Sequence, residues 1–199
     1  MVAQLLIELN NIEPRIWRRL AVPSNITLDE LHCVIQGAFA WEDRHLHRFI
    51  IDDQIYENCE DYETDELEDI NDEREVSLST LVKQNEHFFY IYDFGDDWRH
   101  RITVEKLEFG KHDPFNPVIP HCIGGARACP PEDCGGPWSY PDFIASLFDE
   151  THADYEENKA WALGFEPEIF SVPQASALIA ASYVWQMERK GKSLSPFDF

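Results

Sequence analysis

A short segment rich in aspartate and aromatic residues carries the side chains best suited to chemistry. Its candidate catalytic residues are Asp93, Asp96, Asp97 and His100. Three carboxylates and an imidazole at a turn between two strands can bind a divalent cation, or act as general acid and base. Aspartate and glycine are also what a hairpin turn requires, with Trp98 and His100 then on the outgoing strand. Both interpretations stay open, and turn statistics favour the plain turn.

A second segment concentrates cysteine, glycine and proline. Its candidate zinc ligands are Cys122, Cys129, Cys134 and His121, with His100 as an alternative fourth ligand. Thiolates suit zinc because they are soft and charged. Standard sites pair their ligands closely, whereas six and four residues separate these cysteines. The spacing therefore favours the alternative, in which the cysteines are small buried residues of a rigid loop.

The two segments are expected to touch, because two polar loops that did not meet would leave backbone groups unpaired. Glu132 and Asp133 follow Pro130-Pro131, and we expect them to anchor a turn or cap a helix by accepting backbone N–H bonds. Alternatively, they are acidic ligands of a site shared with Asp93 or Asp96. Trp98 and Tyr140 are the expected aromatic walls of the resulting cleft. The predicted binding residues are Tyr92, Trp98, His100, Glu132, Asp133 and Tyr140.

These segments resemble the signature blocks of the plasmid pRiA4b open-reading-frame-three-like proteins. The match is carried by Tyr92-Asp93-Phe94-Gly95-Asp96-Asp97-Trp98 with His100, and by Cys122 with Ala128-Cys129-Pro130-Pro131-Glu132-Asp133-Cys134-Gly135-Gly136. Further support comes from Pro14 to Arg19, Asp29-Leu31-His32 and Phe39-Trp41. The chain departs from the family pattern at Trp138-Ser139-Tyr140, where a second glycine is expected before the tyrosine. The resemblance covers about residues 3 to 175. It implies an α+β fold and an association with mobile elements, transposons among them, but no established activity.

Composition limits the partners of the chain. The 199 residues carry a net charge of −22, which argues against nucleic-acid binding because phosphates would be repelled. Thirteen carboxylates and one arginine lie between Asp52 and Glu75. Within this run we expect a short strand at Gln54 to Tyr56 and a mobile, solvated stretch from Cys59 to Asp72. We expect a cytoplasmic protein, because the number of cysteines is odd, at five, and no signal peptide pattern follows Met1. We expect no membrane span, because the sequence has no long apolar run.

Two smaller groups of basic residues have open interpretations. Arg15, Arg18 and Arg19 form either an anion-binding patch or, as the overall acidity favours, outward side chains paired with carboxylates. His45 and His47 flank Leu46 on one face of a strand. They are either a pair of metal ligands or, more commonly for such positions, exposed polar residues.

The periodicity predicts an α+β fold, with a mixed sheet wrapped on a central helix in a β-grasp-like arrangement and a C-terminal helical extension. Thr27 and Glu30 predict a capping box for the central helix. Its face Leu28, Leu31, Ile35 and Phe39 is predicted to be buried, along with Ile7, Leu9, Phe89 and Ile91. The expected organisation is an α+β core over 1–110, an ordered loop over 111–141, helices of the same unit over 142–188 and a tail over 189–199.

Three functions fit this sequence. The first is a non-catalytic binding module with a protein partner, which is favoured because nucleophile elbow, phosphate-loop and zinc-protease motifs are absent. The second is a metal-dependent hydrolase that uses Asp93, Asp96, Asp97 and His100. The third is an acidic nucleic-acid mimic built on the 52–75 run. The apolar C-terminal helix is expected to pack on the sheet or to form a homodimer.

Overall fold

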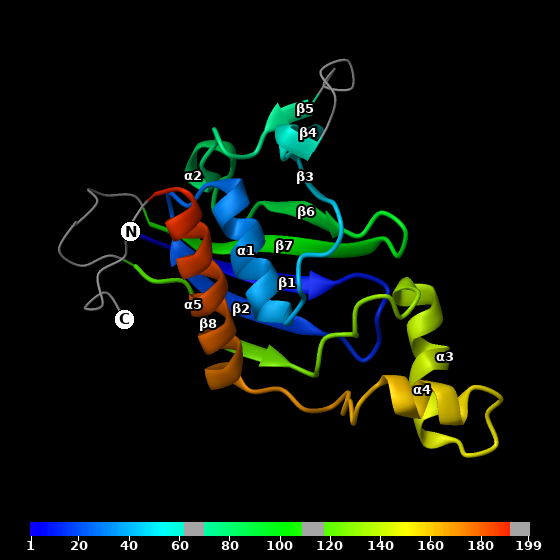
Figure 1. The fold of residues 1–199 in the computed structure, drawn as a ribbon. Coiled ribbons are helices and arrows are strands. Elements are labelled where there is room, and N and C mark those ends of the chain that lie inside the picture. The colour runs from blue at the N-terminus through cyan, green and yellow to red at the C-terminus, as the bar shows by residue number, and fades with distance from the viewer. Residues whose placement is uncertain (62–69, 109–117, 192–199) are drawn as a thin grey trace.

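The computed structural model describes residues 1–61, 70–108 and 118–191. Eight strands form one mixed sheet in the order β5-β4-β3-β6-β7-β1-β2-β8 (Figure 1). The strands are β1 Val2–Leu9, β2 Trp17–Pro23, β3 His47–Ile51, β4 Gln54–Glu57, β5 Ile70–Asp72, β6 His87–Tyr92, β7 Trp98–Leu107 and β8 His121–Ala126. Neighbouring strands are antiparallel except β4 and β5. The predicted α+β class is confirmed.

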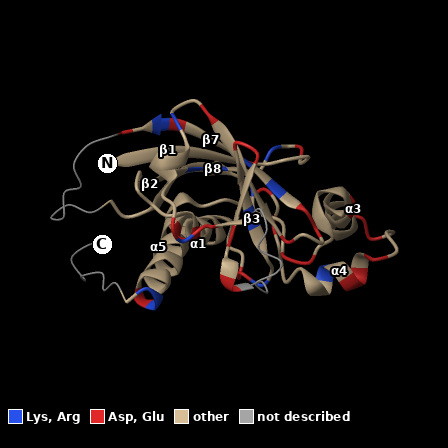
Figure 2. Ribbon diagram, turned by 90° about the horizontal axis from the view of Figure 1, so that it is seen from above, with Lys and Arg blue, Asp and Glu red and all other residues tan. Residues whose placement is uncertain are grey.

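Two long helices lie on the same side of this sheet (Figure 2). The helices are α1 Leu28–Phe39, α2 Leu78–Leu81, α3 Gly136–Phe148, α4 Tyr155–Trp161 and α5 Val172–Arg189, with a 3₁₀ turn, η1, at Cys59–Asp61. The predicted capping box begins α1, and Glu30 accepts a hydrogen bond from the Thr27 backbone N–H at 3.3 Å. α5 packs directly on α1, because a Cβ at Gly37 would lie 2.8 Å from the Ile179 backbone.

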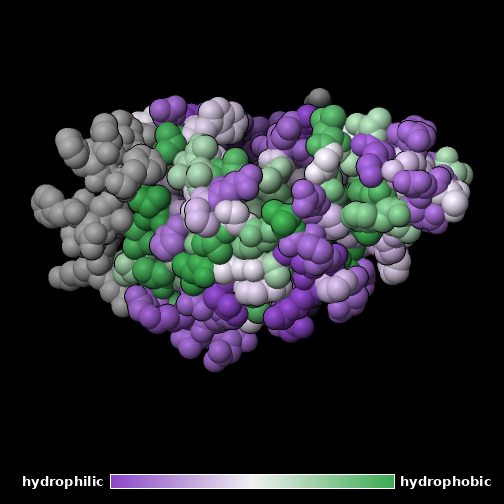
Figure 3. All heavy atoms as spheres, turned by 90° about the horizontal axis from the view of Figure 1, so that it is seen from below, coloured by the Kyte–Doolittle hydropathy of each residue, from purple (hydrophilic) through white to green (hydrophobic). Residues whose placement is uncertain are grey.

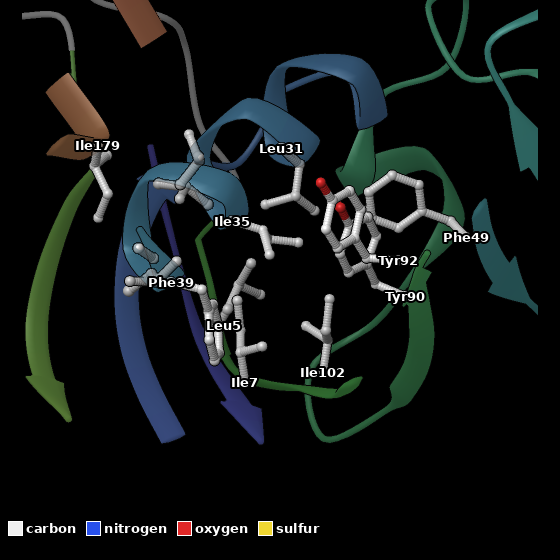
Figure 4. Close-up of a cluster of buried hydrophobic side chains, with 14 of the residues drawn as sticks. Leu5, Ile7, Leu31, Ile35, Phe39, Phe49, Tyr90, Tyr92, Ile102 and Ile179 are labelled. Carbon is white, nitrogen blue, oxygen red and sulfur yellow. The ribbon is translucent and has the colours of Figure 1, made fainter. Parts of the chain in front are cut away.

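The predicted face of α1 is confirmed, since Leu28, Leu31 and Ile35 are fully buried and Phe39 is 1% exposed. Figure 4 shows this face pointing toward Leu5, Ile7 and Ile102 of the sheet. The prediction for β6 was wrong in one position: Phe88, not Phe89, belongs to the buried core. Alternation along the strand puts Phe88, Tyr90 and Tyr92 on the helix side, so Phe89 falls on the opposite face.

The segment predicted as a loop over 111–141 contains regular structure. β8 pairs with β2 at the sheet edge, and α3 begins at Gly136 instead of residue 142. Gly124 and Gly125 hid this strand from the sequence pattern, because glycine is disfavoured in strand interiors. Residues 109–117 lie outside the described part of the chain.

Two carboxylates of the acidic run, on either side of the stretch expected to be solvated, are buried. β4 and β5 lie within the run, and Glu57 and Glu73 are 1% and 2% exposed. Both buried carboxylates have a basic side chain as partner: Arg48 Nε lies 2.7 Å from Glu57 Oε1, and His47 Nε2 lies 2.9 Å from Glu73 Oε2. Residues 62–69, the centre of the run, lie outside the described residues.

The arginines of β2 and of the segment just before it divide between two environments. Arg19 forms an ion pair with Glu105 at 2.7 Å, and Arg15 forms one with Glu8 at 2.9 Å, as outward strand residues were expected to do. Arg18 is instead 2% exposed, and its guanidinium donates to the Ala38 carbonyl at 3.0 Å, near the C-terminal end of α1. The expectation that all three point outward was therefore wrong, because Arg18 lies on the helix-covered face.

The described helices lack the combination of length and apolar character that a membrane-spanning segment requires.

Candidate functional site

The two signature segments meet, as predicted. The Gly135 N–H donates to Asp96 Oδ2 at 3.1 Å, and the Tyr92 hydroxyl donates to Glu132. A Cβ at Gly136 would lie only 2.3 Å from the Asp96 carbonyl oxygen, and Gly136 has a φ of +76°. The start of α3 therefore packs on the β6–β7 turn at a distance that only glycine allows.

At Trp98 and Tyr140 the two segments pack together and do not form the expected cleft. Trp98 and Tyr140 do face each other, with ring centroids 6.5 Å apart. They are 1% and 2% exposed, so they belong to the core and do not form walls of a cleft. Strand alternation explains this outcome, since Trp98 lies on the helix-covered side of β7.

The four residues proposed as a catalytic cluster do not converge. Asp93 Oδ1 accepts the Gly95 N–H at 2.9 Å, which stabilises the turn itself. Asp96 accepts from Gly135, and Asp97 lies 3.8 Å from Arg99. His100 is fully buried, and its Nδ1 lies 3.0 Å from the Trp98 carbonyl oxygen. Burial lowers the pKa of His100 to about 3, so this imidazole is neutral.

The candidate cysteine ligands do not form a cluster either. Within the described residues, three groups of His, Cys, Asp or Glu have ligand atoms that all lie within 4.8 Å of one another, and none contains a cysteine or His121. Cys122 lies in β8, with Sγ 3.2 Å from the Gly124 carbonyl oxygen. Burial raises the pKa of Cys129 well above its ordinary value, and that of Cys134 to about 12, so these thiols are protonated.

Glu132 and Asp133 connect the loop to the segment that precedes β3. Glu132 Oε2 accepts the Glu42 N–H at 2.9 Å, which is the anchoring role predicted for it. Asp133 Oδ1 lies 2.9 Å from His45 Nε2, and Asp93 Oδ2 lies 3.6 Å from the same nitrogen. His45, Asp93 and Asp133 form one of the three groups with metal-ligand spacing, with Asp93 buried and Asp133 exposed.

A pocket of about 370 Å³ lies on the other side of this segment, between α1, β3 and the C-terminal end of α5. Its polar lining includes His32, Asp43, His47, Glu73, Arg74 and Arg189. His32 and Asp43 come from α1 and the segment after it, whereas Glu73 comes from the end of the acidic run. The pocket therefore collects residues from three distant parts of the chain.

The two histidines of the pocket are stacked, with ring centroids 3.5 Å apart and an interplanar angle of 5°. Each has a carboxylate at its Nε2 atom: Asp43 Oδ1 lies 2.9 Å from His32, and Glu73 Oε2 lies 2.9 Å from His47. His32, Asp43 and His47 form a second group with metal-ligand spacing. This group is the more buried of the two, since His32 is 4% exposed.

The second ring nitrogen of His32 is also hydrogen-bonded, which fixes the orientation of the ring. Its Nδ1 lies 2.8 Å from the hydroxyl of Tyr90, which also accepts from Gln36 Nε2 at 3.0 Å. Gln36 Oε1 in turn accepts the Asp43 N–H at 3.1 Å. Because the Asp43 carboxylate can only accept, His32 Nε2 carries the proton and Nδ1 accepts a hydrogen bond from the Tyr90 hydroxyl.

The charges in the pocket suit a cation. Burial, reinforced by the nearby His47, lowers the pKa of His32 and outweighs the influence of Asp43. Burial would raise the pKa of Asp43, but the hydrogen bond with His32 and the nearby basic groups, Arg189 among them, lower it overall. A neutral imidazole beside an ionised carboxylate is the protonation pattern of a metal ligand pair.

Sequence reasoning found only part of this pocket. His47 was considered as a ligand together with His45, but the partners of His47 are His32 and Glu73. One signal was present: His32 and Gln36 are four residues apart, so they lie on the same side of α1. Glu73 was hidden in a run of carboxylates that looked uniformly solvated.

The comparisons with known proteins agree with this architecture. Residues 1–174 match the model of the family described as Plasmid pRiA4b ORF-3-like protein. The chain is 36% identical over 162 residues to the uncharacterized protein y4hQ of Sinorhizobium fredii (strain NBRC 101917 / NGR234), covering 80% of each sequence. It also resembles the crystal structure of a protein of unknown function, MM3350, from Methanosarcina mazei Go1, with a TM-score of 0.74, 34% identity and coverage of 86% of this chain and 96% of that one. The chain therefore belongs to the family of plasmid pRiA4b ORF-3-like proteins.

Proposed function

We propose that this protein is a metal-dependent hydrolase whose divalent transition-metal ion binds to His32, Asp43 and His47. The observation that carries the proposal is the spacing of these donors, whose ligand atoms lie within 4.8 Å of one another in a pocket of about 370 Å³. Ligands about 2 Å from a common ion are separated by distances of this order. The hydrolase expected from the sequence used a different group of residues, Asp93, Asp96, Asp97 and His100.

The chemistry of the donors favours zinc. Imidazole nitrogens suit zinc and the neighbouring transition metals, whereas Mg²⁺ and Ca²⁺ prefer sites made of oxygen ligands. A metal-bound histidine usually hydrogen-bonds through its other ring nitrogen, which fixes the orientation of the ring. The contact of His32 with Tyr90 supplies this support at 2.8 Å.

The open pocket supports a catalytic role over a structural one. Structural zinc sites are closed by four protein ligands, whereas catalytic sites keep one position for water. Zinc lowers the pKa of such a water to about 7. Glu73 Oε2 lies 2.9 Å from His47 Nε2, so this carboxylate lies beside the proposed ligands and would be placed to accept the proton of the water. The hydroxide would then attack the substrate, and the leaving group would take that proton.

Metal binding is the first test. The purified protein is stripped with a chelator and titrated calorimetrically with zinc, in parallel with His32→Ala, His47→Ala and the matched control His87→Ala. We expect one zinc ion per chain for the unmodified protein and the control, because His87 is exposed on β6 and outside the pocket. Removal of one ligand should weaken binding by about 10-fold or more, the order seen even when only a hydrogen-bond partner of a ligand is removed. Equal affinity in all four proteins would overturn the proposal.

A hydrolytic role is tested next with the zinc-loaded protein. Chromogenic carboxylic and phosphoric esters serve as probes, and Glu73→Gln is compared with the unmodified protein. We expect the variant to keep zinc and lose most of the rate, because an amide cannot accept the proton. Hydrolysis that is unchanged by this substitution would exclude Glu73 as the base.

A protein-interaction module is the second candidate, and it was the function favoured by the sequence. It is supported by exposed aromatic residues around α3, where Trp138 is 77% exposed and Phe148 is 69% exposed. By contrast, hydrophobic residues seen from below the β8 edge form small patches separated by polar ones (Figure 3). A cytoplasmic location, a protein partner and a homodimer through the C-terminal helix stay predictions.

A further inference from the structure

We infer that Arg189 of α5 binds an anionic group of the substrate, a phosphate-type oxyanion, beside the proposed metal ion. The inference rests on the proposed function, because it concerns the same pocket and the same reaction. Arg189, Trp185 and Gln186 line the pocket that contains His32, Asp43 and His47. The guanidinium group is a planar fork of N–H donors that matches the oxygens of phosphate and carboxylate groups.

Arg189 differs from the other arginines of the pocket in having no carboxylate partner. Arg44 pairs with Glu42, and Arg74 pairs with Glu60 and with Asp72 at 2.7 Å. Among the ion pairs of the described residues, none within 4.0 Å involves Arg189, which lines the pocket at the end of α5. In a chain with a net charge of −22, an arginine without such a partner in the described part of the chain is available for an external anion.

The side chain is also held in place. Its guanidinium carbon lies 4.7 Å from the ring centroid of Trp185, which is 50% exposed. Stacking on an aromatic ring leaves the N–H edges of arginine free to bind a ligand. The restriction lowers the entropy that the side chain would lose on binding.

The end of α5 is anchored to the start of α1. Lys190 Nζ donates to Glu30 at 3.0 Å and forms an ion pair with Asp29 at 2.7 Å. Gln186 Nε2 also donates to Asp29, at 2.7 Å. These bonds fix the helix end that presents Arg189, so its position relative to the histidines is part of the fold.

The position of Arg189 along the chain also bears on its proposed role. The family match ends at residue 174, whereas α5 spans Val172–Arg189. The wall of the pocket that would select the substrate therefore lies outside the matched region, while the proposed metal ligands lie within it.

The carboxylates of the pocket determine how an anion would bind. Asp29, Asp43, Glu60 and Glu73 all line it, and they would repel phosphate from the metal-free protein. A bound divalent cation offsets this repulsion. The inference therefore predicts that the oxyanion binds to the zinc-loaded protein and not to the metal-free protein.

Calorimetric titration tests this prediction. Zinc-loaded protein, freed of excess zinc, is titrated with inorganic phosphate, and acetate is titrated separately to identify a preference for carboxylates. The variants are Arg189→Gln, Arg189→Lys and the matched control Arg101→Gln, since Arg101 is exposed on β7 and outside the pocket. Zinc affinity is measured for each variant first.

The expected result is that every variant still binds zinc, whereas phosphate affinity of the zinc-loaded protein is about tenfold or more lower in Arg189→Gln, as for a lost hydrogen bond to a charged group. Arg189→Lys should be intermediate, because it keeps the charge but loses the fork. Equal phosphate affinity in Arg189→Gln and the unmodified protein would overturn the inference alone. Tighter binding of acetate than phosphate would also overturn it. Failure to bind zinc would instead overturn the proposed function, and the inference with it.

Discussion

The imidazole rings of His32 and His47 lie stacked, 3.5 Å between centroids, although one belongs to α1 and the other to β3. Two protonated imidazoles could not occupy these positions without strong repulsion. The stacking therefore requires at least one neutral ring, and burial lowers the pKa of His32 accordingly. This pair connects the helix to the sheet at the pocket where we propose that the metal ion binds.

The proposed metal site predicts a stability change on metal removal. Zinc that binds only the folded state at about 100 times its dissociation constant should raise the unfolding free energy by about 2.7 kcal/mol. We expect a chelator to lower the midpoint of thermal unfolding of the unmodified protein, and to leave that of His32→Ala unchanged. Identical shifts in both proteins would show that the stabilising metal binds elsewhere.

The buried face of α1 predicts a large packing effect. Leu31 is fully buried against the sheet, so Leu31→Ala should lower the unfolding free energy by about 2–5 kcal/mol through the cavity it leaves. Leu163 is 92% exposed, and Leu163→Ala should change stability by less than about 0.5 kcal/mol. Urea denaturation measures both. A cost below half a kilocalorie for Leu31→Ala would mean that the core is misplaced.

The junction between α3 and the β6–β7 turn predicts a second destabilising change. Alanine at Gly136 must adopt a φ near +76° and place its Cβ against the Asp96 carbonyl oxygen. The left-handed conformation alone costs about 1–2 kcal/mol, and the steric overlap adds to it. Gly191 has a φ of +67°, and a Cβ added there would have no atom within 4 Å, so Gly191→Ala isolates the conformational cost. Equal losses in the two variants, measured by thermal unfolding, would argue against the close contact.

His100 predicts a pH dependence of stability. Its folded pKa of about 3 lies below the ordinary value of 6.5, so the unfolded chain takes up a proton below pH 6.5 while the folded chain does not. The folded state should therefore lose stability as pH falls from 6.5 toward 3, by about 1.4 kcal/mol per pH unit at most. His100→Asn keeps a side-chain N–H but cannot titrate in this range. The difference in unfolding free energy between the unmodified protein and His100→Asn should therefore decrease by roughly 2 kcal/mol as the pH falls from about 6.5 to about 4.5. Parallel pH profiles would contradict the assignment.

The sequence by itself determined the α+β class, the capped central helix and its buried face, because periodicity and capping are local properties. It also predicted that the two signature segments meet and that Glu132 anchors a backbone turn. These predictions depend on the requirement that buried polar groups find partners, which holds before any fold is known.

Only the tertiary structure decided which polar residues converge. Strand alternation places the side chains of Trp98 and His100 in the core. The side chains of Asp93, Asp96 and Asp97 have different partners, although all five residues are neighbours in the sequence. His32, Asp43, His47 and Glu73 are spread over some forty positions, and the packing of α1 against β3 together with the return of the chain after β5 brings them into one pocket. Distance along the chain carries no information about such contacts. They depend on how a helix and a sheet fit together, and that fit is fixed by the whole hydrophobic core.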